Sequence, residues 1–550
     1  MIRTFWVPAL AGAALCLSPA HAAAQSDPAR AHAPLPTTAA ISEADLRTRV
    51  FIFADDSMQG REAGTEGHVK STEYIAAELR ALGLEPAGEN GTYFQAVPLV
   101  RRALDTASAV HVSGAPLALW DEVVPVRVGA ATEVTAVYGG DLHDSSSWIA
   151  RDAARGRMVV LHASRGPLSL VAMREGARYE LAAAVAIAVP PQMLEAYGNF
   201  LRQPQLSLRQ EQASASVPVL LVSSGAAERM IGAPVEGAQP GRTGGAVRVH
   251  LAYSESPAPA RNVVAILPGS DPALRGQYVA IGAHSDHDGI AERAIDHDSL
   301  RAFNTEVERR AQAKGGSLTT AERREIRVNV DSLRAIRPPR LDSIYNGADD
   351  DASGSMAVLE IAEALARAAE KPKRSTLFVW HTAEEKGLVG ADWYTAHPTV
   401  PRDSIVAQLN IDMIGRGGAD DIPNGGPRYL QLIGSRRLST ELGALVETVN
   451  AERATPFVFD YQFDAAGHPE QYYCRSDHYM YARFGIPVVF FSTGDHRDYH
   501  QLTDEPQYIN YGNLTSVTQL IHDVALRVSN LDHRVSVDQP RPPTGAPCRQ

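Results

Sequence analysis

From residue 257 onward, short apolar runs alternate with amphipathic helical patterns. The apolar runs cover residues 263–267, 278–283, 376–380, 405–411 and 486–491. This alternation is typical of a largely parallel sheet, because parallel strands are joined by helical crossovers that cover both faces. We therefore expect an α/β fold with a mixed, largely parallel sheet that helices cover on both faces.

The segment before this region predicts a second, smaller domain. Helical patterns occur near residues 42–53 and 69–82, and the texture then changes to short β-rich runs separated by Gly, Pro and Ser at 106–250. Such runs predict a small α+β module. We expect the main domain to be built from residues 41–105 and 257–530, with the module inserted between its two parts.

A charged insertion, residues 291–343, separates the second and third apolar runs. Thr319 and Glu322 have the spacing of a capping box, which predicts a helix that runs through Arg334. A solvated surface insertion is the leading interpretation. The alternative is a segment that covers the functional site or changes access to it.

Residues 1–24 have the pattern of a secretory signal peptide. Arg3 precedes an apolar run at 5–17, and small residues follow at Ala20 and Ala22. The run is too short to span a bilayer, and no later stretch approaches the roughly 18 to 20 uninterrupted apolar residues that a spanning helix needs. We expect a secreted or periplasmic protein without a stable membrane anchor.

The charge and cysteine content exclude other classes of protein. With 64 acidic and 52 basic side chains, the net charge of -12 argues against nucleic acid as a partner. Three Cys are too few for a disulfide scaffold, whereas 18 His direct attention to imidazole and carboxylate chemistry. Cys474 and Cys548 remain after signal removal, and both a disulfide and two free thiols stay open. The Pro-rich tail at 531–550 is expected to be frayed from Gln539 to Gln550.

Most of the apolar runs lead into ionisable residues. In chain order these are His284, His381, Glu384, Glu385, Asp412, His496 and His500. Ligands of open α/β sheets bind outside the carboxyl ends of the strands, so we expect these side chains to converge in one crevice. The loop at 346–354 adds three successive aspartates just before a helix.

This conjunction predicts a metal site. Each residue alone has an ordinary explanation as a helix cap, a solvated turn or a satisfied polar group. Imidazoles and carboxylates from five separate segments, however, would be costly to hold together without a cation. Nitrogen and oxygen ligands without thiolate suit Zn²⁺ or a similar divalent ion, and a shared carboxylate would give a co-catalytic pair.

The motifs resemble the bacterial leucyl aminopeptidase family of dizinc exopeptidases. The matching segments are 56–61, 83–86, 284–286, 347–354, 383–385, 410–413 and 499–500. The likeness extends from about residue 41 to 530 and implies a zinc exopeptidase fold. The module, with its run at 217–220, resembles more weakly the protease-associated domain that many members carry as an insert.

The resemblance implies two Zn²⁺ ions held by His284, Asp350, Glu385, Asp412 and His500. Asp350, the middle aspartate, would bridge the ions. Glu385 and His500 would complete one site, and His284 and Asp412 the other.

The resemblance also implies two catalytic roles beside the metal ligands. Glu384 would be the general base, and Asp286 would hydrogen-bond His284 and orient it. Adjacent residues on an extended loop point in different directions, so Glu384 and Glu385 hardly both face one metal. The implied reaction is metal-assisted hydrolysis of peptides that have a free N-terminus.

Two histidines compete for these assignments. His478, in the matching segment 476–478, is a rival ligand, although a structural or substrate-side role is the leading interpretation. His496 is nearer the strand end than His500, but only His500 has an aspartate, Asp504, four residues on, as the family pattern does.

Alternative functions also stay open. A carboxypeptidase and a one-metal glutaminyl cyclase of the same scaffold are the nearest, and a noncatalytic binding ectodomain is the rival from another class. A serine hydrolase is excluded because the sequence contains no G-x-S-x-G elbow.

Overall fold

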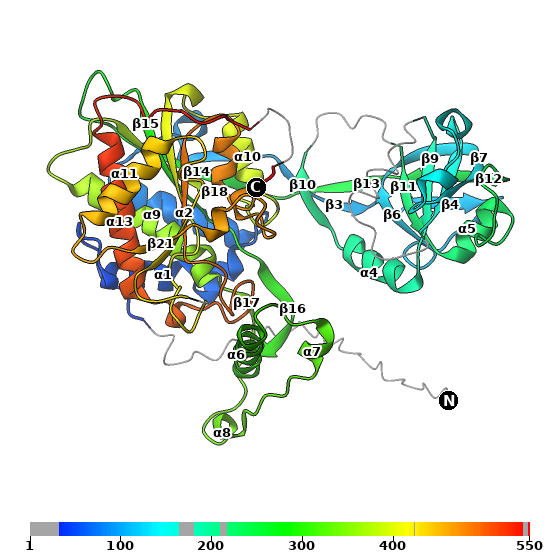
Figure 1. Ribbon diagram of the computed structural model, residues 1–550, viewed down its shortest axis with the longest axis horizontal. Coiled ribbons are helices and arrows are strands. Elements are labelled where there is room, and N and C mark those ends of the chain that lie inside the picture. Colours follow the sequence, from blue (N-terminus) through cyan, green and yellow to red (C-terminus); the bar gives the residue numbers. More distant parts are fainter. Residues whose placement is uncertain (1–31, 164–180, 210–216, 423, 543–547) are drawn as a thin grey trace, which may run out of the picture.

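The computed structural model describes residues 32–163, 181–209, 217–422, 424–542 and 548–550 (Figure 1). The signal peptide predicted at residues 1–24 lies outside the described residues. Within them, no helix combines the length and the apolar character needed to cross a membrane.

The larger domain is built on a nine-stranded sheet. Its strands, in spatial order, are β1 (Glu85–Pro86), β14 (Ala260–Leu267), β18 (Ser375–His381), β15 (Tyr278–His284), β19 (Ile405–Ile411), β22 (Val488–Ser492), β20 (Tyr429–Ile433) and β21 (Val458–Asp460), with β2 (Phe94–Val97) also paired to β14. The central strands β18, β15, β19 and β22 are parallel, whereas β14 and β20 flank them antiparallel. The predicted mixed, largely parallel sheet is confirmed.

Helices cover both faces of this sheet. Alternate strand residues enter separate cores, because successive side chains point to opposite faces: Val263 and Ala265 belong to one core and Val264 to the other. The first core is covered by α1 (Glu43–Phe53), α2 (Glu66–Ala81), α9 (Gly354–Arg367), α11 (Thr440–Ala451) and α13 (Tyr511–Ser529). The second is covered by α10 (Val389–Ala396) and α12 (His478–Ala482).

The apolar runs of the sequence correspond to the strands that carry the site. They became β14, β15, β18, β19 and β22. The helical pattern near residues 42–53 corresponds to α1, which is capped by the side chain of Ser42, an acceptor of a hydrogen bond from the N–H of Asp45. The short strands β1, β2, β20 and β21 were not predicted.

A second unit, which we call the module, occupies residues 105–252. Its eight-stranded sheet has the order β5 (Ala115–Pro116), β4 (Ala109–Val112), β12 (Thr243–Leu251), β7 (Gly129–Asp141), β8 (Met158–His162), β9 (Ala184–Ala188), β11 (Val219–Val222) and β6 (Val123–Arg127). Helices α4 (Pro191–Arg202) and α5 (Ser224–Ile231) pack on it, and it has apolar cores of its own. Its likeness to a protease-associated domain stays a prediction.

A three-stranded antiparallel sheet joins the module to the larger domain. It consists of β10 (Gln205–Leu208), β3 (Leu99–Leu104) and β13 (Tyr253–Pro257). Leu104 pairs with Tyr253, so the chain enters and leaves the module at neighbouring positions. Figure 1 shows this sheet between the two units.

The charged insertion forms a projecting segment, residues 289–345, which we call the arm (Figure 1). Strands β16 (Gly289–Asp296) and β17 (Leu341–Tyr345) pair antiparallel at its base, and they enclose α6 (His297–Lys314), α7 (Thr320–Arg324) and α8 (Asp331–Arg334). The long helix α6 was not predicted, because its sequence is mostly charged and polar.

The capping box predicted in the arm is present between Thr319 and Glu322. The helix ends at Arg324, however, and the prediction that it continues through Arg334 was wrong. Residues 326–330 include β-branched side chains, which lose rotamer freedom in a helix and weaken its continuation.

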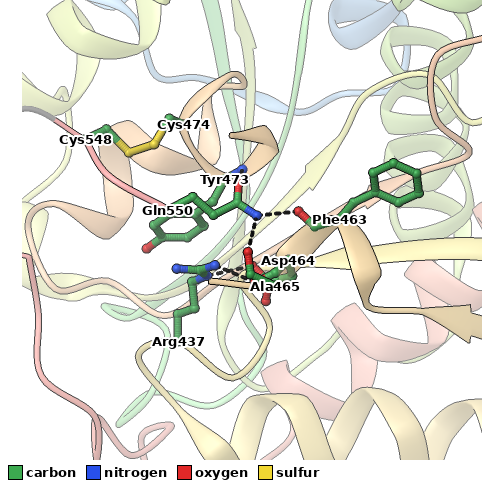
Figure 2. The surroundings of a disulfide bond; sticks show 8 residues. All are labelled: Arg437, Phe463, Asp464, Ala465, Tyr473, Cys474, Cys548 and Gln550. Atoms are coloured by element: carbon green, nitrogen blue, oxygen red, sulfur yellow. Dashed lines mark hydrogen bonds and ion pairs between the residues drawn. A yellow bond between two sulfur atoms is a disulfide. The ribbon is translucent and has the colours of Figure 1, made fainter. Parts of the chain in front are cut away.

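The last residues of the chain are fixed, so the expectation of a frayed end was wrong for them. Cys548 forms a disulfide with Cys474, with the two Cα atoms 5.7 Å apart. The side chain of Gln550 donates a hydrogen bond to the carbonyl oxygen of Ala465 at 3.1 Å and accepts one from the N–H of Tyr473 at 3.0 Å (Figure 2). The question left open for the two cysteines is thereby answered.

Candidate metal centre

Ionisable side chains gather at the carboxyl ends of the central parallel strands. β15 ends at His284 and β18 at His381, and β19 leads directly into Asp412. The loops at 347–353 and 493–505 approach the same edge, as the contacts below show. The expected convergence is present for His284, Glu385, Asp412 and His500, whereas the ring of His381 packs against Tyr394 and Tyr481 instead.

Asp350 lies at the centre of the predicted ligands. Its Oδ1 atom is 3.1 Å from Nε2 of His284, and its Oδ2 atom is 3.2 Å from Nε2 of His500. Asp412 Oδ1 lies 3.7 Å from Nε2 of His284, and Glu385 Oε2 lies 3.2 Å from Nε2 of His500. Two pairs of donors thus flank one shared carboxylate.

The chemistry and spacing of these donors fit two zinc ions. Ligand atoms about 2.0 to 2.1 Å from a tetrahedral zinc lie about 3.3 Å from one another. The separations around Asp350, 3.1 to 3.7 Å, agree with that value. All donors are nitrogen or oxygen, which suits Zn²⁺.

Asp351 is close enough to the other donors to be an alternative to Asp350 as a metal ligand, but its hydrogen bonds argue against that role. Its carboxylate comes close enough to His284 and Asp412 to share an ion with them. Yet it already accepts hydrogen bonds from three backbone N–H groups, those of His284, Gly354 and Met413. These bonds fix the loop geometry and use three of the roughly four lone-pair sites of the Asp351 carboxylate, which leaves Asp350 as the better bridging ligand.

Asp504 ties the two ligand-bearing loops together. Its carboxylate accepts the N–H of Asp349 at 3.0 Å and the N–H of Asp350 at 3.1 Å. Asp349 in turn faces Nε2 of His496 at 3.2 Å. His496, the alternative to His500, therefore contacts Asp349 and not the donors around Asp350.

Glu384 and Glu385 diverge, as expected. Glu385 contacts His500, whereas Glu384 belongs to none of the groups of described residues whose ligand atoms lie close enough to share an ion. Both line the same cavity. Burial raises the pKa of the Glu384 carboxyl well above its ordinary value, against the opposing effect of His284. A carboxylate with a raised pKa suits general base catalysis near neutral pH.

Asp286 differs from its expected role. Its main-chain oxygen, not its carboxylate, accepts the hydrogen bond from Nδ1 of His284 at 3.1 Å. Its carboxylate oxygen Oδ1 is 3.9 Å from that nitrogen and instead accepts the N–H of Glu384 at 3.1 Å. Asp286 thus orients His284 through the backbone, leaves Nε2 of that ring free for a metal, and holds the predicted base.

Two residues of the site were missed in the sequence. His287 is buried and donates from Nδ1 to Oε1 of Glu385 at 2.7 Å. Asp288 Oδ2 lies 3.1 Å from Nδ1 of His500, on the opposite side of the ring from Nε2. A carboxylate in that position fixes the orientation of a ligating imidazole. A signal was available, because both residues follow His284 within one short segment.

The charge around His500 is strongly negative. Burial alone would lower the pKa of His500, but the carboxylates of Asp288, Asp350 and Glu385 raise this pKa above its ordinary value. This surplus of negative charge is what a divalent cation would compensate.

His478 lies apart from these donors. Its ring is buried and stacks on Phe490 with centroids 4.9 Å apart, and burial lowers its pKa to about 3. Among the described groups that could hold an ion, none includes His478. The packing favours the structural interpretation over the ligand role.

A cavity of about 340 Å³ opens onto the donors. Beyond Asp350, Glu384, Glu385 and Asp412 it is lined by Gly387, Leu388, Met413, Tyr472, Cys474, Arg475, Ser476, Phe490, Ser492, Asp495 and Tyr499. None of these described lining residues comes from the arm. The arm therefore does not form a wall of this cavity.

A family model described as peptidase family M28 matches residues 262–525. This segment contains all of the predicted metal ligands. Over 78 residues the chain is 45% identical to leupeptin-inactivating enzyme 1 of Streptomyces exfoliatus, covering 14% of this chain and 18% of the relative. Over 181 residues it is 28% identical to leucine aminopeptidase 1 of Penicillium rubens, covering 30% and 43%. The chain thus spans less than half the length of these curated relatives.

Solved structures align with most of the chain, but at low sequence identity and with a TM-score below 0.5. An aminopeptidase from Aneurinibacillus sp. strain AM-1 aligns with a TM-score of 0.48 and 16% identity, covering 92% of this chain and 98% of that one. A zinc aminopeptidase from Bacillus subtilis aligns with a TM-score of 0.44 and 16% identity, covering 89% and 95%. Overlaps at this level carry no argument about activity.

Proposed function

Since a model of peptidase family M28 matches residues 262–525, we propose that this protein is a dizinc aminopeptidase that releases residues from the N-terminus of peptides. The observation that carries the proposal is the position of the Asp350 carboxylate, whose oxygens lie 3.1 Å from Nε2 of His284 and 3.2 Å from Nε2 of His500. Glu384, which is not among the donors around Asp350, lines the same cavity.

Five side chains would hold the metal pair. Asp350 would bridge the ions, with His284 and Asp412 completing one site and Glu385 and His500 the other. When bound, the two zinc ions lower the pKa of a water molecule and polarise the scissile carbonyl.

The remaining steps belong to side chains of the protein. Glu384 accepts the proton of the attacking water and returns it to the leaving amine. Its main-chain N–H is held by Asp286 at 3.1 Å, which keeps the base in place. His287 orients Glu385 by donating a hydrogen bond to its carboxylate. Asp288 orients His500 because its carboxylate faces Nδ1 of the ring.

Two observations support an aminopeptidase over its alternatives. The relatives named above include a leucine aminopeptidase, and the cavity of about 340 Å³ is at the small end of the range for ligand sites, which suits one terminal residue.

Two donor pairs around Asp350 favour two ions over the single ion of a glutaminyl cyclase, and an intact Glu384 argues against a noncatalytic ectodomain. Carboxypeptidase activity is the alternative that only substrates can exclude.

Glu384→Gln tests the mechanism most directly. The change keeps the shape of the side chain but removes the base, so we expect zinc content to be unchanged and kcat to fall by about 10² to 10⁴, with a much smaller change in KM. Glu385→Gln is the matched control and should lose one zinc. Elemental analysis and steady-state kinetics measure both. Zinc loss in Glu384→Gln together with retention in Glu385→Gln would exchange the two roles.

Substrate choice separates the alternative reactions. We expect hydrolysis of peptides with a free N-terminus and none of the same peptides after N-acetylation. A carboxypeptidase would cleave both from the other end, and a cyclase would convert N-terminal glutamine without releasing an amino acid. A noncatalytic protein would turn over none of them.

We also propose that the protein is exported, to the periplasm or the medium. The support is the signal-peptide pattern at residues 1–24 and the disulfide between Cys474 and Cys548, since disulfides persist in oxidising compartments. N-terminal sequencing of exported material should find Ala23 or Gln25 first. Soluble exported protein that retains Met1 would contradict this proposal.

A further inference from the structure

His500 is the least firmly anchored of the predicted zinc ligands. Its side chain is 34% exposed, whereas none of the other four exceeds 10%. It lies on the loop at 493–505 and not at a strand end. Its φ of 53° lies in the left-handed region, which residues with a Cβ rarely adopt. Contacts around the loop must therefore hold His500 in this conformation.

The helix α6 of the arm contacts this loop on both sides of His500. Arg301 Nη1 lies 2.7 Å from Oδ2 of Asp498, two residues before His500. Asn304 Nδ2 donates to Oγ1 of Thr503 at 3.3 Å, three residues after it. Thr503 donates in turn to Oδ1 of Asp498 at 2.7 Å, which closes a ring of polar contacts between α6 and the loop residues on either side of His500 in the sequence.

Asp498 is the centre of these contacts. Its carboxylate is completely buried and has a second cationic partner, Arg416, whose Nη2 lies 3.0 Å away. The guanidinium of Arg301 also lies over the ring of Tyr508, 3.4 Å from its centroid. Loss of Arg301 would thus leave Asp498 paired with Arg416, but would break the ion pair between Asp498 and α6 and leave the weaker hydrogen bonds from Asn304 to Thr503 and from Arg497 to Thr305 to hold the loop.

The arm is itself fixed at its base. Asp298, in the first turn of α6, accepts hydrogen bonds from Arg334, Arg337 and Arg340. The strand β16 begins directly after Asp288, whose carboxylate faces Nδ1 of His500. Both ends of the connection from the arm to His500 are therefore held in place.

We propose that α6 clamps the loop at 493–505 and that Arg301 is a positioning residue for His500. No arm residue is among the described residues that line the cavity. The arm instead acts on the site by controlling how firmly His500 holds its zinc ion. This inference rests on the proposed function, because the second zinc is the group that His500 would hold.

Arg301→Gln in the full chain tests the clamp. Arg309→Gln, at a solvent-exposed position of the same helix where the arginine pairs with Glu306, is the matched control. Zinc-loaded proteins are dialysed against a series of chelator concentrations, and the zinc remaining per chain is measured. Loss of a group that hydrogen-bonds a metal ligand directly costs about 10- to 100-fold in metal affinity, and Arg301 acts one contact further out, through Asp498, so the lower end of this range applies. We expect Arg301→Gln to lose one of its two ions at a roughly tenfold lower chelator concentration, and to retain the other as the wild type does.

Two further measurements distinguish positioning from a general loss of structure. Arg301→Lys keeps the charge and should recover part of the zinc retention. Amide hydrogen exchange within residues 493–505 of the metal-free protein should be faster in Arg301→Gln than in Arg309→Gln, with unchanged exchange in α9 and α13. Parallel loss of both ions, equal behaviour of the two variants, or unchanged exchange in the loop would each overturn the clamp. A wild type that binds no zinc would overturn the proposed function, and the exchange result would then decide on the clamp alone.

Discussion

Three histidines outside the metal cluster are buried in neutral form. Burial lowers the pKa of His68, His381 and His478 to about 3, from an ordinary value of 6.5. Between these values the unfolded chain binds more protons than the folded chain. The free energy of unfolding contributed by each histidine is thus fully present above pH 6.5 and is lost progressively as the pH falls toward 3.

His478→Phe should therefore reduce the fall in the free energy of unfolding that accompanies a fall in pH. Between pH 7.5 and pH 5, one such histidine costs about 2 kcal/mol, so the variant should show a correspondingly smaller fall in the free energy of unfolding. Phenylalanine keeps the ring that stacks on Phe490, and zinc content should stay at the wild-type level. Denaturant unfolding at both pH values measures the effect, with His397→Phe at the surface as control. An unchanged fall, or loss of zinc, would contradict this interpretation of His478.

At the same scale, sequence reasoning located ligands better than it located the residues that support them. His284 and Asp412 could be predicted because each directly follows an apolar run, and strand ends meet at one edge of a parallel sheet. Their assignment to particular ions needed the family resemblance. His287 and Asp288 were missed because neither follows a strand directly, and their roles depend on the contacts of single ring nitrogens, Nδ1 of His287 and Nδ1 of His500. That Asp286 uses its main-chain oxygen is likewise a property of the turn geometry.

Secondary-structure elements were predictable where burial imposes a pattern. β18 and β19 are buried along their whole length and β15 from its second residue on, and all three appear in the sequence as continuous apolar runs. The helix α6 is mostly solvated, so it has no apolar stripe from which it could be recognised. The short strands β20 and β21 resemble other apolar segments of similar length, and only their neighbours identify them.

The module is an element that the metal centre should not need. Leu104 pairs with Tyr253, and the N–H of Asp105 donates to the carbonyl oxygen of Ala252 at 2.9 Å, so a short turn could replace residues 105–252. We expect the shortened protein to retain two zinc ions and to hydrolyse short peptides. Its stability should fall, because the excision removes β10 from the edge of β3. Elemental analysis and circular dichroism test this expectation, and a well-folded deletion without zinc would contradict it.

Across the whole molecule, the disulfide connects the end of the chain to the candidate site. Cys474 lines the cavity, and its bond to Cys548 closes a segment with a sequence separation of 74 residues. Gln550 adds hydrogen bonds to the loop that precedes Cys474 (Figure 2). The pairing could not be derived from sequence, because cysteine spacing carries no information on distance at such a separation. The C-terminus is thus part of the framework of the cavity.

Removal of this bond should destabilise the larger domain. A cross-link over such a segment restricts the unfolded chain by about 4 kcal/mol in the chain-entropy treatment, which sets the upper range of the loss expected for Cys548→Ser. Cys474→Ser should lose a similar amount, and the double variant should lose no more than either single variant, because one substitution already breaks the bond. Gln550→Ala, which keeps the disulfide, should cost only about 1 to 2 kcal/mol. Thermal and denaturant unfolding of the four variants provide the measurement. A double variant much less stable than both single variants would mean that the cysteines stabilise the fold separately and not through their bond.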